Sequence, residues 1–295
     1  MSIESRLRLF SAIEGGSPFW THELAIYGSE DLVNRIMQGE YASTRKSSER
    51  IRQNLIEGDT RALQQEIDDA GARFITPESI EWPTSMGDLL APPIGLVIKG
   101  GEIRERSVAI VGTRNPTTYG ARVASEFASG FADREWAVVS GGAYGIDTHA
   151  HRGAIAAEGV TYAVLASGVS VNYPAGNEKL FNEIAESGAL VSEVMPKERA
   201  RPERFLTRNR IIAALAHGTV VVEAAFRSGS LRTARDAAEI LRTVMAVPGP
   251  INSPTSEGCH RLIGERCAEI VTSVADALEL MMPLAHQIEE SNQKT

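Results

Sequence analysis

From residue 94 onward the chain alternates short apolar runs with longer helical stretches. The apolar runs, which are rich in β-branched residues, are 94–98, 108–111, 137–139, 162–165, 190–191, 220–222, 244–247 and 270–271. Runs that are apolar throughout fit strands buried on both faces of a sheet. The helical stretches between them include 122–134, 148–157, 177–187, 207–216 and 230–242. Strand followed by helix, repeated along the chain, predicts an α/β fold with a doubly wound, mostly parallel sheet.

The first 75 residues have a different pattern of apolar residues. Apolar positions such as Leu7, Phe10 and Ile13 recur at three- and four-residue steps, and glycines fall between the candidate helices. This pattern predicts a small helical domain at 1–75, a proline-rich linker at 76–93 and an α/β core domain at 94–282. Residues 283–295 are expected to be a polar tail after one last helix at 274–282, with no winged helix.

The net charge of −8 does not by itself favour a nucleic-acid binder, since phosphate affinity depends on Lys and Arg. The charges are unevenly spread, however. Residues 197–210 hold six cations against two anions, and residues 43–52 hold four cations against Glu49 alone. A basic patch on an acidic protein creates a directional field. A solvated charged face remains the simpler alternative for either cluster.

Two cysteines in 295 residues, Cys259 and Cys267, indicate a reducing compartment, and their spacing matches no zinc site. The N-terminus lacks the apolar stretch of a signal peptide, and no run approaches the about 20 apolar residues of a membrane span. We therefore expect a cytoplasmic protein with no membrane contact.

Ligands of doubly wound sheets bind beyond the carboxyl ends of the strands, so the loops there come first. The first contains Gly112, Thr113 and Arg114, and combines a close-approach glycine, a hydroxyl and a guanidinium before a helix. An ordinary strand–helix turn is the alternative. Because the loop is not GxGxxG, it does not indicate a dinucleotide site.

The loop after 137–139 has three glycines in six residues, among them Gly141 and Gly142, which would form a nest of backbone N–H groups. Asp147 is expected to cap the next helix rather than to act in catalysis. His149 and His151 point to different helical faces and make a poor metal pair, so we expect no metal site. For the loop at 167–174, plain packing is the favoured interpretation.

Two further segments carry cations. Residues 204–210 place Phe205 just before Arg208, Asn209 and Arg210, which suits phosphate contacts beside a stacking ring. The alternative is a solvated helix start with a buried phenylalanine. The last loop offers an anion site at a helix N-terminus, with nearby cations. Its residues are Ser228, Gly229, Ser230 and Arg232.

In order along the chain, these segments resemble the motifs of the DprA/Smf family of bacterial DNA-processing proteins. The matching stretches are 112–114 with 119–120, 140–147 with 150–151, 173–174 with 177, 192–193, 205 with 208–213, 222–224 with 228–234, 247–249 and 258–263. The similarity covers 94 to about 272. The N-terminal region also suits the family, as a small SAM or helix-hairpin-helix-like domain.

The resemblance implies an extended Rossmann-like fold, usually homodimeric, that binds single-stranded DNA without a cofactor. It also implies protection of incoming strands during natural transformation and help in loading RecA. Carried over by position, Gly112, Thr113, Arg114 and the 228–230 loop would hold phosphate, Phe205 would lie near a base, and Arg208 and Arg210 would hold the backbone. The chain departs from the family at Thr113, usually Ser, Ser170, usually Asp, and Leu206, usually Pro.

Two other functional classes stay open. The glycine-rich loops, with Glu223 before residues 228–230, also resemble those of phosphoribohydrolases of the lysine-decarboxylase-like type. Those enzymes have a glutamate directly after the loop, and this chain does not. A protein-interaction or defence adaptor with incidental basic loops is the third class. No spacing in the sequence ties a nucleophile, a base and an acid together, so we predict no catalysis.

Overall fold

The computed structural model describes residues 2–43, 47–104 and 106–282. Its helices are α1 (Ile3–Ala12), α2 (Pro18–Met37), α3 (Ser48–Glu57), α4 (Thr60–Asp69), α5 (Thr118–Ala132), α6 (Ile146–Ala156), α7 (Glu178–Ser187), α8 (Pro202–Leu215), α9 (Ser230–Glu239), α10 (Glu257–Gly264) and α11 (Val274–Met281), with short 3-10 turns η1 (Thr84–Asp88) and η2 (Ala175–Asn177). Its strands are β1 (Arg73–Ile75), β2 (Leu96–Gly100), β3 (Ser107–Val111), β4 (Ala137–Ser140), β5 (Thr161–Leu165), β6 (Ala189–Ser192), β7 (Gly218–Val221), β8 (Thr243–Ala246) and β9 (Glu269–Ile270).

The nine described strands form one sheet, in the order β1-β2-β6-β5-β4-β3-β7-β8-β9. In this spatial order, all the strands from β6 through β3 to β9 pair in parallel with their neighbours. Strand β2 pairs antiparallel with both β6 and β1 at one end of the sheet. This arrangement confirms the predicted α/β class with a mostly parallel sheet. The chain runs outward from β3 to β6 on one side and returns through α8 to β7 on the other. The switch point therefore lies between β3 and β7.

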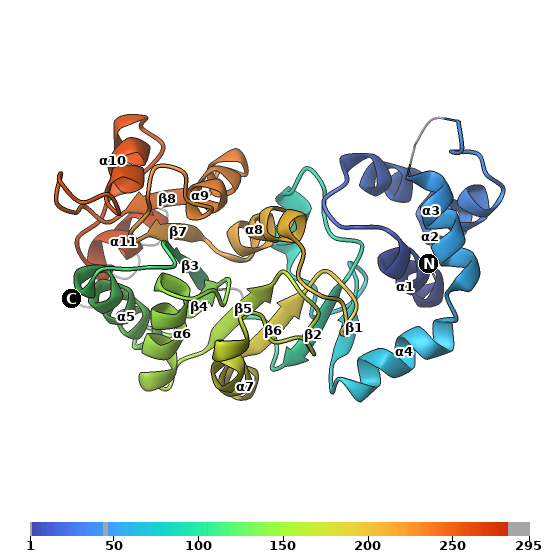
Figure 1. Cartoon of the computed structure of the whole chain (residues 1–295), viewed down its shortest axis with the longest axis horizontal. Coiled ribbons are helices and arrows are strands. Elements are labelled where there is room, and N and C mark those ends of the chain that lie inside the picture. Colours follow the sequence, from blue (N-terminus) through green and yellow to red (C-terminus); the bar gives the residue numbers. More distant parts are fainter. Residues whose placement is uncertain (1, 44–46, 105, 283–295) are drawn as a thin grey trace, which may run out of the picture.

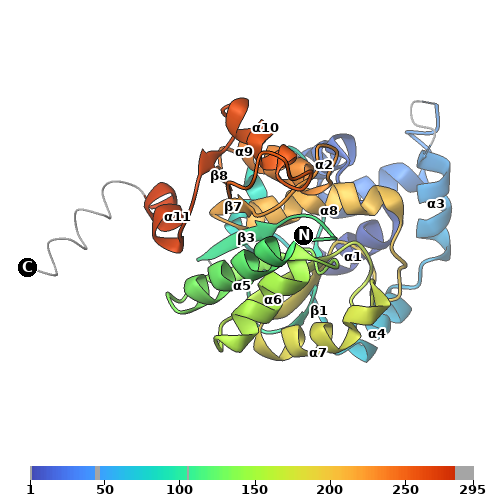
Figure 2. The ribbon, with the colours of Figure 1, turned by 60° about the vertical axis from the view of Figure 1, so that its left-hand side comes forward.

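Helices cover both faces of the sheet, with α5, α6 and α7 on one side and α8 and α9 on the other (Figure 2). Neighbouring residues of β3 show why helices pack on both faces. Val108 and Ile110 pack with the apolar side chains of α5 and α6, whereas Ala109 and Val111 pack with those of α8 and α9. Successive side chains of a strand point to opposite faces, so a strand buried on both faces must be apolar throughout.

The N-terminal helices α1–α4 lie at the β1 end of the sheet (Figure 1). Their apolar side chains form one buried cluster with residues of the core, such as Val97, Leu165 and Phe181. The sheet also begins earlier than the predicted core, because β1 precedes the linker and pairs with β2. Within the linker, Met86 is fully buried in the main core cluster. The predicted tail, 283–295, lies outside the described residues.

Candidate functional site

A cleft of about 390 Å³ opens at the carboxyl edge of the sheet, at the switch point between β3 and β7. Loops after β3, β4 and β7 and one face of α8 line it. The lining residues are Val111, Gly112, Thr113, Arg114, Ala143, Asp147, Phe205, Leu206, Arg208, Asn209, Ile212, Ala225, Arg227, Ser228, Gly229, Ser230 and Thr233. Nine of the thirteen site residues expected from the sequence are among them; Gly141, Gly142, Arg210 and Arg232 are not.

Helix α8 contributes five residues to the cleft, and four of them lie on one helical face. It begins at Pro202, five residues before the predicted start, and a proline is favoured in the first turn because its missing N–H has no partner there in any case. Phe205, Arg208, Asn209 and Ile212 follow the spacing i, i+3, i+4, i+7 and therefore share one side. The segment 204–210 is thus helical, and its helical period decides which cations reach the cleft.

Arg208 is buried, and its guanidinium binds the backbone of two strand ends. Its Nη1 donates to the carbonyl of Gly141 at 2.7 Å and to the carbonyl of Val164. Burial lowers the pKa of Arg208 to about 10, although the charge of Asp147 opposes that shift. A β-carbon on Gly141 would lie 2.5 Å from Nη1 of Arg208, so a glycine is needed for this approach. Arg208 therefore positions the ends of β4 and β5, while part of its side chain lines the cleft.

Asp147 organises the glycine-rich loop instead of capping its own helix. Its carboxylate accepts hydrogen bonds from the backbone N–H groups of Gly141 at 3.2 Å and Ala143 at 3.3 Å. Burial raises the pKa of Asp147, and the charge of Arg208 opposes this rise. Gly142 adopts a positive φ of 67° and packs against the ring of Phe181. The loop N–H of Gly141 is thus already satisfied within the protein, rather than open to a ligand.

The first loop is held by Glu223, a buried residue that follows β7. Its carboxylate accepts from the N–H of Thr117 at 2.8 Å and from the hydroxyls of Thr117 at 2.6 Å and Thr255 at 3.1 Å. Its carbonyl also accepts from the N–H of Thr113 at 2.7 Å. The sequence interpretation missed this role; a lone glutamate directly after a buried strand was the available signal. Glu223 is not among the residues that line the cleft.

Arg114 extends from this loop into solvent and lies over Phe205. Its guanidinium carbon is 5.4 Å from the centre of that ring. The distance is within the range of a cation–π contact. A free guanidinium beside a half-buried aromatic ring therefore stands at the mouth of the cleft.

The opposite wall is the loop 228–230 at the start of α9. The hydroxyls of Ser228 and Ser230 are 2.7 Å apart, and Asn209 donates from Nδ2 to the carbonyl of Gly229 at 3.3 Å. The first N–H groups of this helix already have acceptors in the loop. Ser230 donates to Oγ of Ser228 at 3.4 Å, Leu231 to the carbonyl of Ser228 at 3.2 Å, and Arg232 to the carbonyl of Gly229 at 3.0 Å. The dipole of this ten-residue helix favours an anion near its N-terminus.

Two of the expected cations lie outside the cleft. Arg210 is on another face of α8 and pairs with Glu193, and their side chains are only 13% and 10% exposed. Arg232 has a 56% exposed side chain that pairs with Asp236 one helical turn later, at 2.7 Å. Both guanidinium groups have carboxylate partners, and their predicted contacts to DNA stay predictions.

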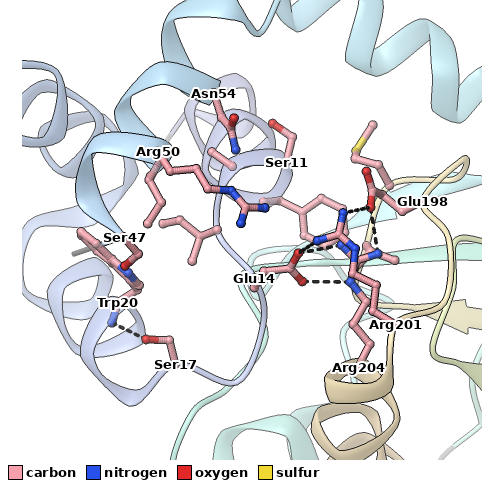
Figure 3. A pocket seen from close by; sticks show the side chains of 16 residues that line it. Ser11, Glu14, Ser17, Trp20, Ser47, Arg50, Asn54, Glu198, Arg201 and Arg204 are labelled. Carbon is pink, nitrogen blue, oxygen red and sulfur yellow. Dashed lines mark hydrogen bonds and ion pairs between the residues drawn. The ribbon is translucent and has the colours of Figure 1, made fainter. Parts of the chain in front are cut away.

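Glu14, from the N-terminal region, contacts the first turn of α8 (Figure 3). Glu14 and Glu198 bind the guanidinium of Arg204 at 2.6 and 2.8 Å, and Arg201 adds a contact to Glu14 at 3.3 Å. These residues and Arg50 line a cavity of about 260 Å³ between α1, α3 and α8. The first turn of the helix that carries Phe205 and Arg208 is thus anchored by ion pairs to Glu14 and Glu198.

Within the described ranges, no group of three or more His, Cys, Asp or Glu side chains could hold a metal ion. Among the same residues, no helix is both long and apolar enough to span a bilayer.

Comparison with known proteins gives one consistent family. The family model described as DNA recombination-mediator protein A matches residues 73–282, starting at the first residue of β1. A Mycobacterium tuberculosis protein named as a DNA processing protein DprA is 46% identical over 226 residues, 72% of this chain and 58% of the relative. The chain therefore spans under three fifths of the length of that relative. DNA processing protein DprA of Streptococcus pneumoniae is 40% identical, over 67% of this chain and 70% of its own length.

Solved structures agree with this result. The X-ray structure of DprA from Streptococcus pneumoniae superposes with a TM-score of 0.82 at 31% identity, covering 95% of this chain and 98% of the other. A Helicobacter pylori DNA processing protein A, whose single-stranded DNA binding mode was the subject of that structure, gives 0.64 at 28% identity, over 71% of this chain and 96% of its own. With more than half of its length matched by the family model, this chain belongs to the DNA recombination-mediator protein A family, the DprA/Smf proteins.

Proposed function

We propose that this chain binds single-stranded DNA in the cleft between β3 and β7, with little preference for sequence. The observation that carries the proposal is the placement of Arg114 over Phe205, in the cleft that the N-terminus of α9 also lines. A cation and the positive end of a helix dipole attract phosphate, while an aromatic ring stacks on any base. Binding by the Helicobacter pylori relative supports the same ligand class.

The residues of the cleft then divide into two roles. Arg114 and the 228–230 loop contact phosphate, with Gly112 and Thr113 shaping the approach, and Phe205 stacks on a base. Arg208 and Asn209 hold these elements in place, because their side chains donate to the carbonyls of Gly141 and Gly229. The N–H of Gly141 is in turn bound by the carboxylate of Asp147. This division differs from the one expected from the sequence, in which Arg208 and Arg210 contacted the DNA backbone.

Membership of the family supports a proposal for the wider role of the protein. We infer that it protects single strands and helps load a RecA recombinase during transformation or recombination, and that it works as a homodimer in the cytoplasm. Strand β9 supports pairing between copies, since it is an edge of the sheet and both of its residues are exposed. The two free thiols, Cys259 and Cys267, suit a reducing compartment.

The phosphoribohydrolase alternative requires an acidic group aimed at the ligand. Glu223, its candidate, is 3% exposed, and its carboxylate accepts three hydrogen bonds from threonines. A carboxylate occupied in this way holds a loop and is poorly placed to act on a substrate. Release of adenine from AMP by the purified protein would favour the enzyme over the DNA binder.

The test of the proposal is binding to oligo-dT at increasing salt. Affinity is expected to fall steeply with salt, because each phosphate contact releases counterions. Arg114→Ala should weaken binding for all sequences alike and reduce the log–log salt slope by about 0.7. Arg122→Ala is the control, since Arg122 is a 69% exposed arginine of α5 outside the cleft. An unchanged affinity and slope in Arg114→Ala would overturn the assignment of this cleft.

A further inference from the structure

Exposed aromatic rings gather at one edge of the molecule. In the part of the chain that the structure describes, the exposed large aromatic residues are Tyr119, Tyr144, Tyr173 and Phe226, at 39–49% exposure. Each comes from the loop or first helical turn after a parallel strand, namely β3, β4, β5 and β7. Aromatic surface left in water at one rim is typical of a binding surface.

Two of these rings adjoin the cleft. The ring of Tyr173 lies 5.4 Å from that of Phe205, centre to centre, in an edge-to-face arrangement. The hydroxyl of Tyr144 accepts from the N–H of Gly176, three residues after Tyr173, at 3.2 Å. A β-carbon on Gly176 would lie 2.5 Å from that hydroxyl, so the glycine permits this contact. Phe205 and Tyr173, which contact each other, and Tyr144, which binds the turn after Tyr173, are here called the aromatic shelf.

The shelf is continuous with the cleft at two points. Phe205 lines the cleft and contacts Tyr173, and Ala143, which also lines the cleft, directly precedes Tyr144. Arg114 lies over Phe205 and so places a positive charge at the boundary between cleft and shelf. A ligand that binds the cleft through phosphate and continues outward meets flat rings next.

We propose that the aromatic shelf continues the single-stranded DNA site, with Tyr173 and Tyr144 each stacking on a base beyond the one at Phe205. This inference rests on the proposed function, since it assumes that the strand lies in the cleft. Tyr173 and Tyr144 lie in the loops after β5 and β4, and Arg114, which lies over Phe205, is in the loop after β3. These three strands are neighbours in the sheet. Two steps between strands span about 10 Å, the length of about three stacked bases at ~3.4 Å each.

The shelf can be tested with oligonucleotides that keep their phosphates and lose their bases. The probes are dT12 and a 12-mer of the same backbone with abasic sites throughout. For dT12, Tyr173→Ala and Tyr144→Ala should each lower affinity by about 5-fold or more, because stacking contributes about that factor per base. Tyr173→Phe and Tyr144→Phe keep the ring and should bind as the wild type does. On the abasic probe, the Ala variants and the wild type should bind alike.

Folding and remote effects are controlled separately. Tyr173→Leu keeps apolar volume against Phe205 but has no flat ring, so it should lose the same factor while melting near the wild-type temperature. Tyr27→Ala removes a tyrosine that contacts Arg35 in α2, in the N-terminal region, and should leave affinity for dT12 unchanged.

Failure of the shelf and failure of the function give different results. If wild-type binding to dT12 is salt-dependent and sensitive to Arg114→Ala, but the shelf variants stay within 2-fold of wild type, the shelf is overturned and the cleft stands. If the wild type does not bind dT12, the proposed function is overturned, and the proposed role of the shelf is overturned with it. Equal losses of the Ala variants on both probes would also overturn stacking, because the abasic probe has nothing to stack.

Discussion

Arg204 donates to both carboxylate oxygens of Glu14, from Nε at 2.9 Å and from Nη2 at 2.6 Å. Glu14 lies in the turn between α1 and α2, and Arg204 lies in the first turn of α8. The contact therefore links the N-terminal helices to the helix that carries Phe205. Burial opposes ionisation of Glu14, but the hydrogen bond and charge of Arg204 outweigh it, and the pKa of Glu14 is lowered.

Glu14→Gln should lower the free energy of unfolding by about 1 kcal/mol, because Glu14 is half exposed and solvent screens the pair. Arg204 keeps its second partner, Glu198, at 2.8 Å. Since the pKa of Glu14 is lowered on folding, this contribution is present at pH 7 and lost as the pH falls through the lowered pKa. Urea denaturation at pH 7 measures the difference. Glu30→Gln, in the exposed part of α2, is the control, and equal losses in both variants would contradict the role of Glu14.

The glycine at 141 should tolerate no side chain. In Gly141→Ala the new β-carbon would lie 2.5–2.8 Å from three guanidinium atoms of Arg208, which is buried and bound to two carbonyls. Overpacking of this kind costs about 1–3 kcal/mol. Gly229→Ala is the matched control, because nothing lies within 4 Å of its β-carbon and its φ of −63° suits alanine. Thermal melts of both variants provide the measurement, and an unaffected Gly141→Ala would show that Arg208 moves without cost.

The strands of the core could be predicted because burial on both faces leaves a mark in the local sequence. The run 108–111, for example, became β3 with a difference of one residue, since each of its side chains enters one of two apolar layers. Strand β1 has only three residues, one of them Arg73, and its pairing with β2 across the linker leaves no local pattern. Local apolar runs thus reveal central strands but not short edge strands.

The cleft was predicted in outline, because loops at the carboxyl edge of a parallel sheet must converge. The roles of individual polar residues were harder to predict. Arg208 and Arg210 look equivalent in sequence, but two residues along a helix turn a side chain by about 200°. One guanidinium therefore reaches the ends of β4 and β5, while the other reaches Glu193. Such partners come from distant segments, and composition or spacing does not reveal them.

Arg210 should matter for stability rather than for DNA binding. Burial raises the pKa of Glu193, opposed by the charge and hydrogen bond of Arg210, so the two groups depend on each other. Arg210→Met leaves a buried carboxylate unpaired and should cost about 3–5 kcal/mol, whereas Arg210→Met with Glu193→Leu should recover most of that loss. Urea denaturation of the single and double variants measures the coupling.

The same variants test the contact of Arg210 with DNA that was expected from the sequence. The folded double variant should bind oligo-dT within about 2-fold of the wild type. A loss of affinity in that variant as large as the loss in Arg114→Ala would return Arg210 to the DNA site.

His151 makes the stability of the fold depend on pH. Its Nδ1 is 2.7 Å from the hydroxyl oxygen of Thr161, and that hydroxyl donates to the carbonyl of Val138 at 2.8 Å. Nδ1 therefore acts as the donor. Burial, aided by the charge of Arg208, lowers the pKa of His151 to about 3. Between about pH 6.5 and 3 the unfolded chain holds a proton here that the folded protein lacks, so stability falls as the pH decreases.

The expected slope from this one group is about 1.4 kcal/mol per pH unit below pH 6.5. From pH 7.5 to 5, the free energy of unfolding of the wild type should therefore fall by about 2 kcal/mol more than that of His151→Gln, which cannot titrate. Urea denaturation at several pH values measures both slopes, so the loss of the hydrogen bond to Thr161 cancels from the comparison. Parallel curves for the wild type and His151→Gln would mean that His151 takes up a proton as readily in the folded protein as in the unfolded chain, and would contradict the lowered pKa.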